Sequence, residues 1–394
     1  MWKFSVLKPA LLASVVGALS LGTASGQTLY GLRTDNSLVS FQPATPGAMT
    51  VVDTISGVTA GQTLVGMDFR PATGQLVALG YNQDPNPSLS TAQLYTINLG
   101  TAAATRIAAA FPLDLGAESA ANIGFDFNPT VDRIRVVTRD TDGNFRLNPI
   151  TGTLQATDGN LMYNPGSAGP PVVPADANAG RNPNVGAVAY SNSYIGATST
   201  TMYDADMDFS TITPNTTTII LSIQNPPNAG TLNTINTGSQ PSALVDLDID
   251  IYNNLTSGVQ TGYTVARYQT IVGPPPGTPV EFNLLGIIDF TTATIANQGT
   301  VGTPGPGVPT IVDLAAQIDR TAPAPGGQSF FALSATNWLL TFDSANPTFI
   351  RTAGPTTGLA TGQNLVGLDV RPATGQLYAL GYNPALMSGN TQVY

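Results

Sequence analysis

Aspartates that alternate along one short segment are the first residues in this sequence with the means to do chemistry. Asp246, Asp248 and Asp250 stand at every second position of the segment LVDLDIDI. Successive side chains of a β-strand point to opposite faces, so all three carboxylates would project from one face. Like charges in a row repel one another, and a cation or a group of arginines is expected nearby. The pattern favours a solvated strand face or hydrogen bonding at the strand end, and a weak calcium site is the alternative.

A second group of oxygen-bearing side chains has the spacing of a calcium loop at its start. Asp140, Asp142 and Asn144 occupy positions 1, 3 and 5 of the segment DTDGN. A complete EF-hand loop has glycine at position 6 and a bidentate glutamate at position 12. Here Gly143 is at position 4 and Arg146 at position 7. The Asp-Gly pair favours a hairpin turn between two strands, and calcium is the alternative.

An aspartate also recurs within a repeated motif. Asp68 and Asp369 both occur in the pattern G-x-D-x-R-P, each followed by an arginine, Arg70 or Arg371, and Asp126 stands at the matching position of GFDFNP. Recurrence at one structural position favours an architectural role. Such a carboxylate would accept backbone N–H groups of the neighbouring sheet or pair with an arginine.

Four arginines gather in one further segment: Arg133, Arg135, Arg139 and Arg146. Arg133 and Arg135 alternate, so they would share one strand face. The group would either bind an anion or pair across strands with nearby aspartates, and the sequence does not favour one over the other.

The composition excludes most catalytic chemistry. The 394 residues contain no His and no Cys, and the only lysines are Lys3 and Lys8. This rules out Ser-His and Cys-His nucleophiles and zinc sites built on His or Cys. Beyond those lysines, twelve arginines face 24 acidic residues, a net charge of −12. Nucleic-acid binding needs clustered basic side chains and is not expected. The only glutamates, Glu118 and Glu281, lie in no evident motif.

Residues 1–26 have the pattern of a secretory signal peptide. Lys3 and Lys8 form a positive start, an apolar stretch follows, and Ala24-Ser25-Gly26 supplies the small residues of a cleavage site. The apolar stretch is shorter than the roughly 20 residues that cross a membrane, and no later segment reaches that length. The sequence predicts a secreted, extracellular or cell-surface protein, with the periplasm as a further compartment.

The rest of the sequence alternates short apolar runs with turn residues. The clearest unit is LVGMDFRP, ATG, QLVALGY and then LYTINL, which reads as strands of an antiparallel meander. Related unit starts follow at Gly124, Gly186, Asp246 and Asp313, with Gly66 as the first marker. Their spacing of about 60 residues is typical of β-propeller blades. An irregular β-sandwich is the alternative.

The two ends of this array could close a ring. Thr28–Arg33 matches the second strand of a unit, and its missing first strand could come from Ile311–Ile318. Closure would remove exposed sheet edges. The sequence therefore predicts an all-β protein, a β-propeller of about five four-stranded blades.

A long internal duplication divides the chain. The segment GQTLVGMDFRPATGQLVALGYN, residues 61–82, recurs as GQNLVGLDVRPATGQLYALGYN, residues 362–383, with 18 of 22 positions identical. We expect a signal peptide at 1–26, a propeller domain at 27–319, a Pro/Gly linker at 320–327 and a partial second copy at 328–394. The second copy would be the opening of a further domain or an extra blade of the first ring.

The same motifs carry a family resemblance. The order LVGMDFRPATGQLVALGYN, IGFDFNPTVDRIRVVTRDTDGNFRLNPITGTL and VGAVAYSNS resembles the bacterial family catalogued as domain of unknown function 4394. The resemblance implies an exported, propeller-like protein and no particular reaction.

These observations favour a non-catalytic exported module that binds surface or matrix partners or associates with itself. We expect no catalytic residue and no cofactor other than calcium. The alternative is an extracellular, carboxylate-dependent glycan hydrolase, with or without a dependence on calcium. Tandem copies fit multivalent display.

Overall fold

A computed structural model gives the fold of residues 26–116, 120, 123–213, 216–241, 243–274, 277–318, 326–335 and 337–394. The predicted signal peptide and most of the predicted linker lie outside these residues. Within them, helix is confined to short turns such as η1 (Pro87–Leu89) and η3 (Pro227–Ala229). None of the helices in these residues is long and apolar enough to span a membrane.

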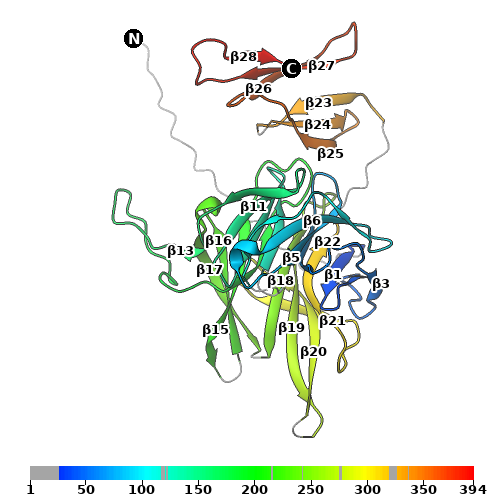
Figure 1. The fold of residues 1–394 in the computed structure, drawn as a ribbon, viewed down its shortest axis with the longest axis vertical. Helices are drawn as coiled ribbons and strands as arrows, with labels where there is room; N and C mark the ends of the chain where they lie inside the picture. Colours follow the sequence, from blue (N-terminus) through cyan, green and yellow to red (C-terminus); the bar gives the residue numbers. More distant parts are fainter. Residues whose placement is uncertain are drawn as a thin grey trace, which may run out of the picture.

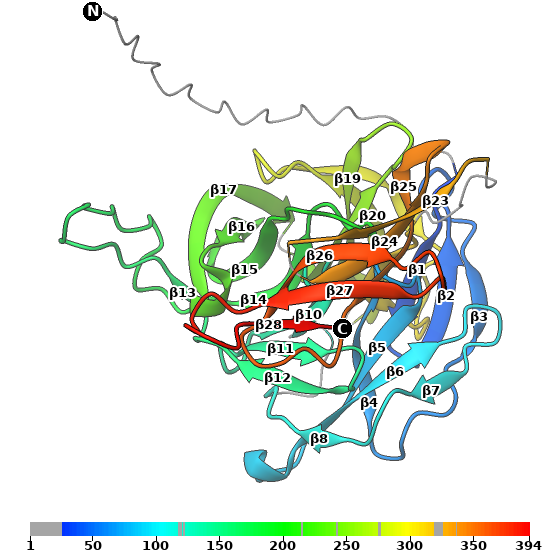
Figure 2. The same ribbon diagram turned by 90° about the horizontal axis from the view of Figure 1, so that it is seen from above.

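Five sheets are arranged around one axis, and their strands pair antiparallel except for the parallel pair of β13 and β17 (Figures 1 and 2). In each sheet the strands are given from the axis outward. The first sheet contains β22 (Ile311–Ala316), β1 (Leu29–Arg33), β2 (Ser37–Phe41) and β3 (Thr50–Thr54). The second contains β4 (Thr63–Phe69), β5 (Leu76–Asn82), β6 (Thr91–Ile97) and β7 (Ala104–Arg106), with β8 (Phe111–Pro112) beside β6. The third contains β9 (Ile123–Asn128), β10 (Arg133–Thr138), β11 (Asn144–Asn148) and β12 (Thr153–Thr157). The fourth contains β14 (Val185–Tyr190), β15 (Met202–Thr213), β16 (Thr216–Gln224), β17 (Thr231–Pro241) and β13 (Met162–Tyr163). The fifth contains β18 (Leu244–Asn253), β19 (Gln260–Val272), β20 (Thr278–Ile288) and β21 (Ile295–Val301).

The innermost strands touch one another in a closed ring, in the order β22, β4, β9, β14, β18 and back to β22. This is the β-propeller that the period of about 60 residues predicts. Each of the five predicted unit starts forms an innermost strand. These strands are buried on both faces, since each face packs against a neighbouring sheet, and this explains their near-continuous apolar runs.

The ring closes through the two ends of the domain, as the sequence predicts. β1 pairs antiparallel with β22, with Leu29 opposite Ala316 and Gly31 opposite Leu314. The side chain of Ile311 fills the space beside Gly31, where a Cβ atom would lie 2.8 Å from its Cδ1 atom. The closing pair leaves the first sheet with no open inner edge.

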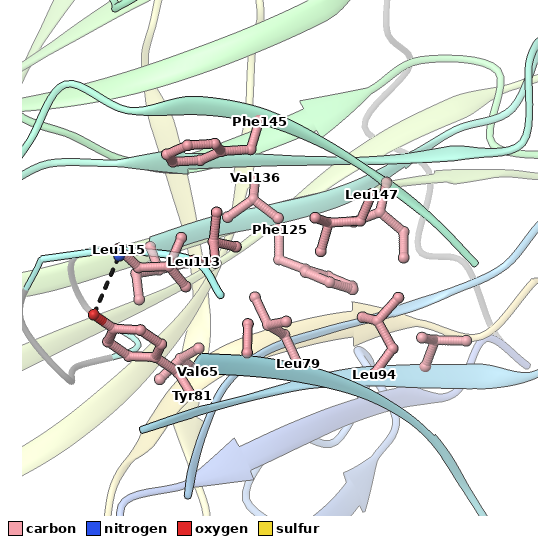
Figure 3. Packing of buried hydrophobic residues seen from close by; sticks show 14 of the residues in the cluster. Val65, Leu79, Tyr81, Leu94, Leu113, Leu115, Phe125, Val136, Phe145 and Leu147 are labelled. Carbon is pink, nitrogen blue, oxygen red and sulfur yellow. Dashed lines mark hydrogen bonds between the residues drawn. The ribbon is translucent and has the colours of Figure 1, made fainter. Parts of the chain in front are cut away.

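Neighbouring sheets pack through apolar side chains. Between the β4 and β9 sheets, Val65 and Leu79 of one sheet face Phe125 and Val136 of the other (Figure 3). The Tyr81 hydroxyl accepts a hydrogen bond from the backbone N–H of Leu115 at 3.2 Å. The apolar cores therefore lie between the sheets, which leaves the axis available for polar side chains.

The second copy forms two small sheets above one end of the ring (Figure 1). Their strands are β23 (Ser329–Leu333), β24 (Trp338–Asp343) and β25 (Asn346–Pro355); and β26 (Asn364–Val370), β27 (Leu377–Tyr382) and β28 (Thr391–Val393). In the structure as described, neither sheet pairs with a ring strand. A cleft separates them from the ring, with Trp338 and Leu333 on one side and the loops that follow β9 and β14 on the other.

The β26–β28 sheet repeats the local structure of β4–β6. The Tyr95 hydroxyl donates to Oε1 of Gln62 at 2.6 Å, and the Tyr394 hydroxyl donates to Oε1 of Gln363 at the same distance. The long duplication is therefore structural as well as sequential.

Candidate metal centre on the propeller axis

Aspartates of the innermost strands line the axis. Asp68 lies on β4, Asp126 on β9, Asp248 and Asp250 on β18, and Asp313 on β22, and each is at most 9% exposed. An innermost strand has a sheet partner along one edge only, so backbone N–H groups along its other edge need acceptors from elsewhere. The aspartates supply these acceptors.

Each carboxylate links its own strand to the next. Asp68 accepts the N–H of Phe69 through Oδ1 at 2.6 Å and the N–H of Phe127, on β9, through Oδ2 at 3.0 Å. Asp250 repeats the pattern, with the N–H of Ile251 at 2.5 Å and that of Ala316, on β22, at 2.6 Å. These bonds confirm the architectural role that the recurring motif predicts.

A second layer of the axis uses the same device. Asp248 accepts the N–H of Leu314 at 2.7 Å, and Asp313 accepts the N–H of Met67, on β4, at 2.9 Å. Together the two layers join β18 to β22, β22 to β4 and β4 to β9. Hydrogen bonds to charged acceptors are stronger than neutral ones, so these contacts hold the ring at its centre.

Three of these carboxylates converge. Asp68, Asp126 and Asp250 each place one oxygen within 4.8 Å of the others. Asp126 accepts the backbone N–H of Tyr190, on β14, while its Oδ1 atom is buried and has no hydrogen-bond partner in the described part of the protein. The charges of the three groups are thus brought together without contact with solvent.

Burial dominates the electrostatics of this group. It raises the pKa of Asp68 and of Asp126 well above the usual range of a carboxyl, and the charge of Asp250 raises both further. Burial raises the pKa of Asp250 to about 7, against the opposing effect of its two backbone hydrogen bonds. Carboxylates placed so closely in a low-dielectric site must share protons or bind a cation.

The predicted set Asp246, Asp248 and Asp250 is divided by the structure. Asp248 and Asp250 face the axis, whereas Asp246 lies 3.9 Å from the guanidinium of Arg267 and accepts the N–H of Leu247 at 2.8 Å. Asp246 therefore has a cationic partner within the protein. Of the three, only Asp250 is in the convergent group.

The predicted set Asp140, Asp142 and Asn144 lies at the turn between β10 and β11. Asp142 has a positive φ of 53°, as the hairpin interpretation expects of the Asp-Gly pair. The Asn144 side chain is fully buried, and its oxygen accepts a hydrogen bond from Arg135 at 2.6 Å. An oxygen already bound by a guanidinium is a poor metal ligand.

Two of the four arginines in the segment from Arg133 to Arg146 form ion pairs with one aspartate. Arg135 and Arg146, on adjacent strands, both donate to Oδ2 of Asp158 at 2.7 Å. Burial pushes the pKa of Asp158 up, but the hydrogen bonds from Arg146 and Arg135 outweigh it and hold that pKa below its usual range. Cross-strand pairing thus accounts for two of the four arginines.

The sequence did not indicate that Asp68, Asp126 and Asp250 would meet. By their hydrogen-bond pattern they are equivalent positions of three strands, whereas the repeat markers placed Asp246 against Gly66. The hydrogen bonds to β22 and from β4 place Asp248 at that position instead, two residues further along β18. If the sequences of β4, β9 and β18 had been aligned with Asp250 opposite Asp68 and Asp126, the three aspartates would have been recognised as one group.

A ring of five sheets closed by its chain ends, with carboxylates on its axis, defines the class of this protein as a β-propeller. The chain belongs to the family described as Domain of unknown function (DUF4394), whose model matches residues 37–315 and again 338–393. The second match covers most of the predicted second copy.

Several solved structures are similar to this chain at low sequence identity. The α-L-arabinanase of Cellvibrio cellulosa is 11% identical, with a TM-score of 0.41 over 70% of this chain and 93% of that one. The Dos1 propeller is 10% identical, with a TM-score of 0.32 over 93% and 80%. An exo-β-1,3-galactanase of Phanerochaete chrysosporium is 12% identical, with a TM-score of 0.37 over 82% and 72%. No curated protein sequence matches the chain.

Proposed function

We propose that this protein is a non-catalytic, exported β-propeller module that associates with itself through its second copy. Residues 1–26 support export through their signal-peptide pattern. The propeller supplies a rigid body, and the second copy supplies an apolar face.

The observation that carries this proposal is a change of exposure between the two copies. Val65, Leu79 and Tyr81 are fully buried in the ring, where they pack against the β9 sheet. Their counterparts are exposed in the second copy: Val366 by 58%, Leu380 by 40% and Tyr382 by 37%. Burying a side chain of this kind contributes roughly 1.5–3 kcal/mol. An exposed face built to receive another sheet is a site of association.

A second copy of this chain is the occupant that the residues favour. The face has the composition of a blade surface, and the described part of each chain presents it. Two chains could bury these faces against each other in a symmetric, isologous contact.

The axis supports the non-catalytic part of the proposal. Its carboxylates are at most 9% exposed and bind backbone N–H groups, so a polymeric substrate has no route to them. A catalytic carboxylate must reach the bond that it cleaves.

The test is sedimentation velocity on the mature protein, residues 27–394, over a range of concentrations. We expect a concentration-dependent dimer, and we expect V366D/L380D to weaken it at least about tenfold, since a buried unpaired charge is costly. The matched control is V172D, at a valine that is 72% exposed in the loop between β13 and β14 and should have no effect. A strict monomer at high concentration would contradict the proposal.

The convergence of the aspartates is the one feature that favours the alternative, a carboxylate-dependent glycan hydrolase. The decisive measurement is release of reducing sugar from a panel of polysaccharides by the mature protein. Release that D126N abolishes, in a folded variant, would establish the hydrolase instead. No release across the panel is what the non-catalytic module predicts.

A further inference from the structure

We propose that the propeller axis binds one calcium-sized divalent cation between Asp68, Asp126 and Asp250. The three side chains come from three different sheets, through β4, β9 and β18. The site would therefore be assembled only when the ring is closed.

The distances fit a single shared ion. One oxygen of each carboxylate lies within 4.8 Å of the others. Two oxygens that each lie about 2.4 Å from the same Ca²⁺ are at most about 4.8 Å apart. The observed spacing is therefore compatible with three ligands around one ion.

An unpaired atom points to the ligand independently of the cluster. Oδ1 of Asp126 is buried in a residue that is only 2% exposed, and it has no hydrogen-bond partner among the described protein groups. The carboxylates that converge with Asp126, those of Asp68 and Asp250, do not offer a positive charge. A buried acceptor left without a donor costs about 1–3 kcal/mol. A cation would satisfy this oxygen and neutralise the group.

Among the described residues, the arginines that form close ion pairs bind carboxylates other than Asp68, Asp126 and Asp250. Arg70 pairs with Asp132, Arg267 with Glu281, and Arg135 and Arg146 with Asp158. These four arginines are thus committed to other carboxylates, and the charge on the axis is left for an external ion.

The ligand chemistry selects a hard cation. The chain contains no His or Cys, so every strong ligand on the axis is oxygen. Mg²⁺ retains several waters and demands near-octahedral geometry, whereas Ca²⁺ accepts flexible sets of six to eight oxygens. Carboxylates held by backbone hydrogen bonds in a buried site suit Ca²⁺ better.

Such an ion would act as a structural clamp. A ligand that binds only the folded state stabilises it in proportion to the logarithm of its concentration over its dissociation constant. Because unfolding separates β4, β9 and β18, the ion would oppose opening of the ring.

The experiment uses the mature protein, residues 27–394, treated with a chelator and transferred to metal-free buffer at neutral pH. Calcium per chain is measured by elemental analysis after dialysis against about 1 mM CaCl₂. This concentration is high enough to load a site with a dissociation constant in the weak part of the range known for calcium-binding proteins. The Tm is measured by circular dichroism with CaCl₂, with MgCl₂ and with chelator. We expect one Ca²⁺ per chain and a rise in Tm of about 5 °C with calcium, larger than with magnesium.

The informative variant is D126N, which keeps an acceptor for the N–H of Tyr190 but removes the charge. We expect calcium affinity to fall at least about tenfold and the calcium-dependent rise in Tm to disappear. Its Tm in chelator should equal or exceed that of the parent, since a buried charge is removed. This comparison shows that the variant folds.

The matched control is D369N, at the counterpart of Asp68 in the second copy. Asp369 is exposed, and its Oδ1 atom accepts a hydrogen bond from the N–H of Val370 at 2.8 Å. The D369N variant should bind calcium with the same affinity as the parent protein. The proposal is overturned if the parent binds no calcium and shows no shift in Tm, or if D126N retains both, or if D369N loses them.

Discussion

One sequence motif occupies two environments in this protein, and single residues show the consequence. Arg70 donates through Nε to Oδ1 of Asp132 at 2.7 Å, and a second bond joins its Nη2 to Oδ2. The Asp132 side chain is fully buried and Arg70 is 12% exposed, so this is a two-point ion pair between the β4 and β9 sheets. Its counterpart Arg371 is exposed.

Replacing Arg70 should therefore be costly, and replacing Arg371 should not. We expect R70L to lower the free energy of unfolding by about 3–5 kcal/mol, because the charge of Asp132 is left buried without a partner. R371L, which makes the same chemical change, should alter it by less than about 0.5 kcal/mol. Urea unfolding followed by circular dichroism measures both, and equal losses would contradict the assigned environments.

At the scale of elements, close approach of neighbouring innermost strands limits side-chain size. A Cβ atom on Gly66, in β4, would lie 2.5 Å from Cβ of Phe125, in β9. The same atom on Gly367, its counterpart in β26, would have its nearest neighbour, Cβ of Leu380, at 3.7 Å. Glycine is thus required where β4 meets another sheet and is not required where β26 lies open.

This difference predicts the outcome of two matched substitutions. G66A should lower the free energy of unfolding by about 1–3 kcal/mol through overpacking. G367A should be neutral or slightly stabilising, since alanine reduces the freedom of the unfolded chain. The comparison is made by thermal unfolding under one set of conditions. A larger loss in G367A than in G66A would mean that the β26–β28 sheet is covered.

At the scale of the whole molecule, a single strand closes the ring. β22 contributes buried Ile311, Leu314 and Ala315, and its Asp313 accepts the N–H of Met67 on β4. Without β22, β1 would have an unpaired edge, and β18 and β4 would lose the strand between them. Closure is therefore a property of the domain from 27 to 318 and does not require the second copy.

Two truncated proteins test this conclusion. The protein of residues 27–318 should unfold in one cooperative transition and remain monomeric, because it keeps the closing strand and lacks the apolar face of the second copy. The protein of residues 27–309 should lose cooperative unfolding or aggregate, since an open edge pairs with other chains. Calorimetry and light scattering distinguish the two. Indistinguishable Tm values would show that closure contributes little.

Several features of the fold followed from the sequence because they depend on local patterns. Turn residues and period-two alternation placed the innermost strands, and a repeat of about 60 residues predicted their arrangement as blades. The match of Thr28–Arg33 to a second strand predicted the closing pair with β22, which the structure confirms. The duplication predicted that β26–β28 would repeat β4–β6.

The candidate site could be predicted only in part. Asp250 was identified from its strand, and Asp68 and Asp126 from their motif, but as members of separate groups. Their convergence depends on how strands more than 50 residues apart are aligned in the ring, and the repeat markers misaligned β18 by two residues. Likewise, the sequence showed acidic neighbours for Arg70 but not that its partner is Asp132 in the next sheet.

The sequence by itself thus determined the class of fold, the closing strand, the excluded chemistries and the duplication, since each rests on residue type or short-range spacing. Only the tertiary structure decided which aspartates meet on the axis and which copies of Val, Leu and Tyr are buried. Both depend on contacts between sheets, and identical residues acquire different burial when one copy has a neighbouring sheet and the other does not.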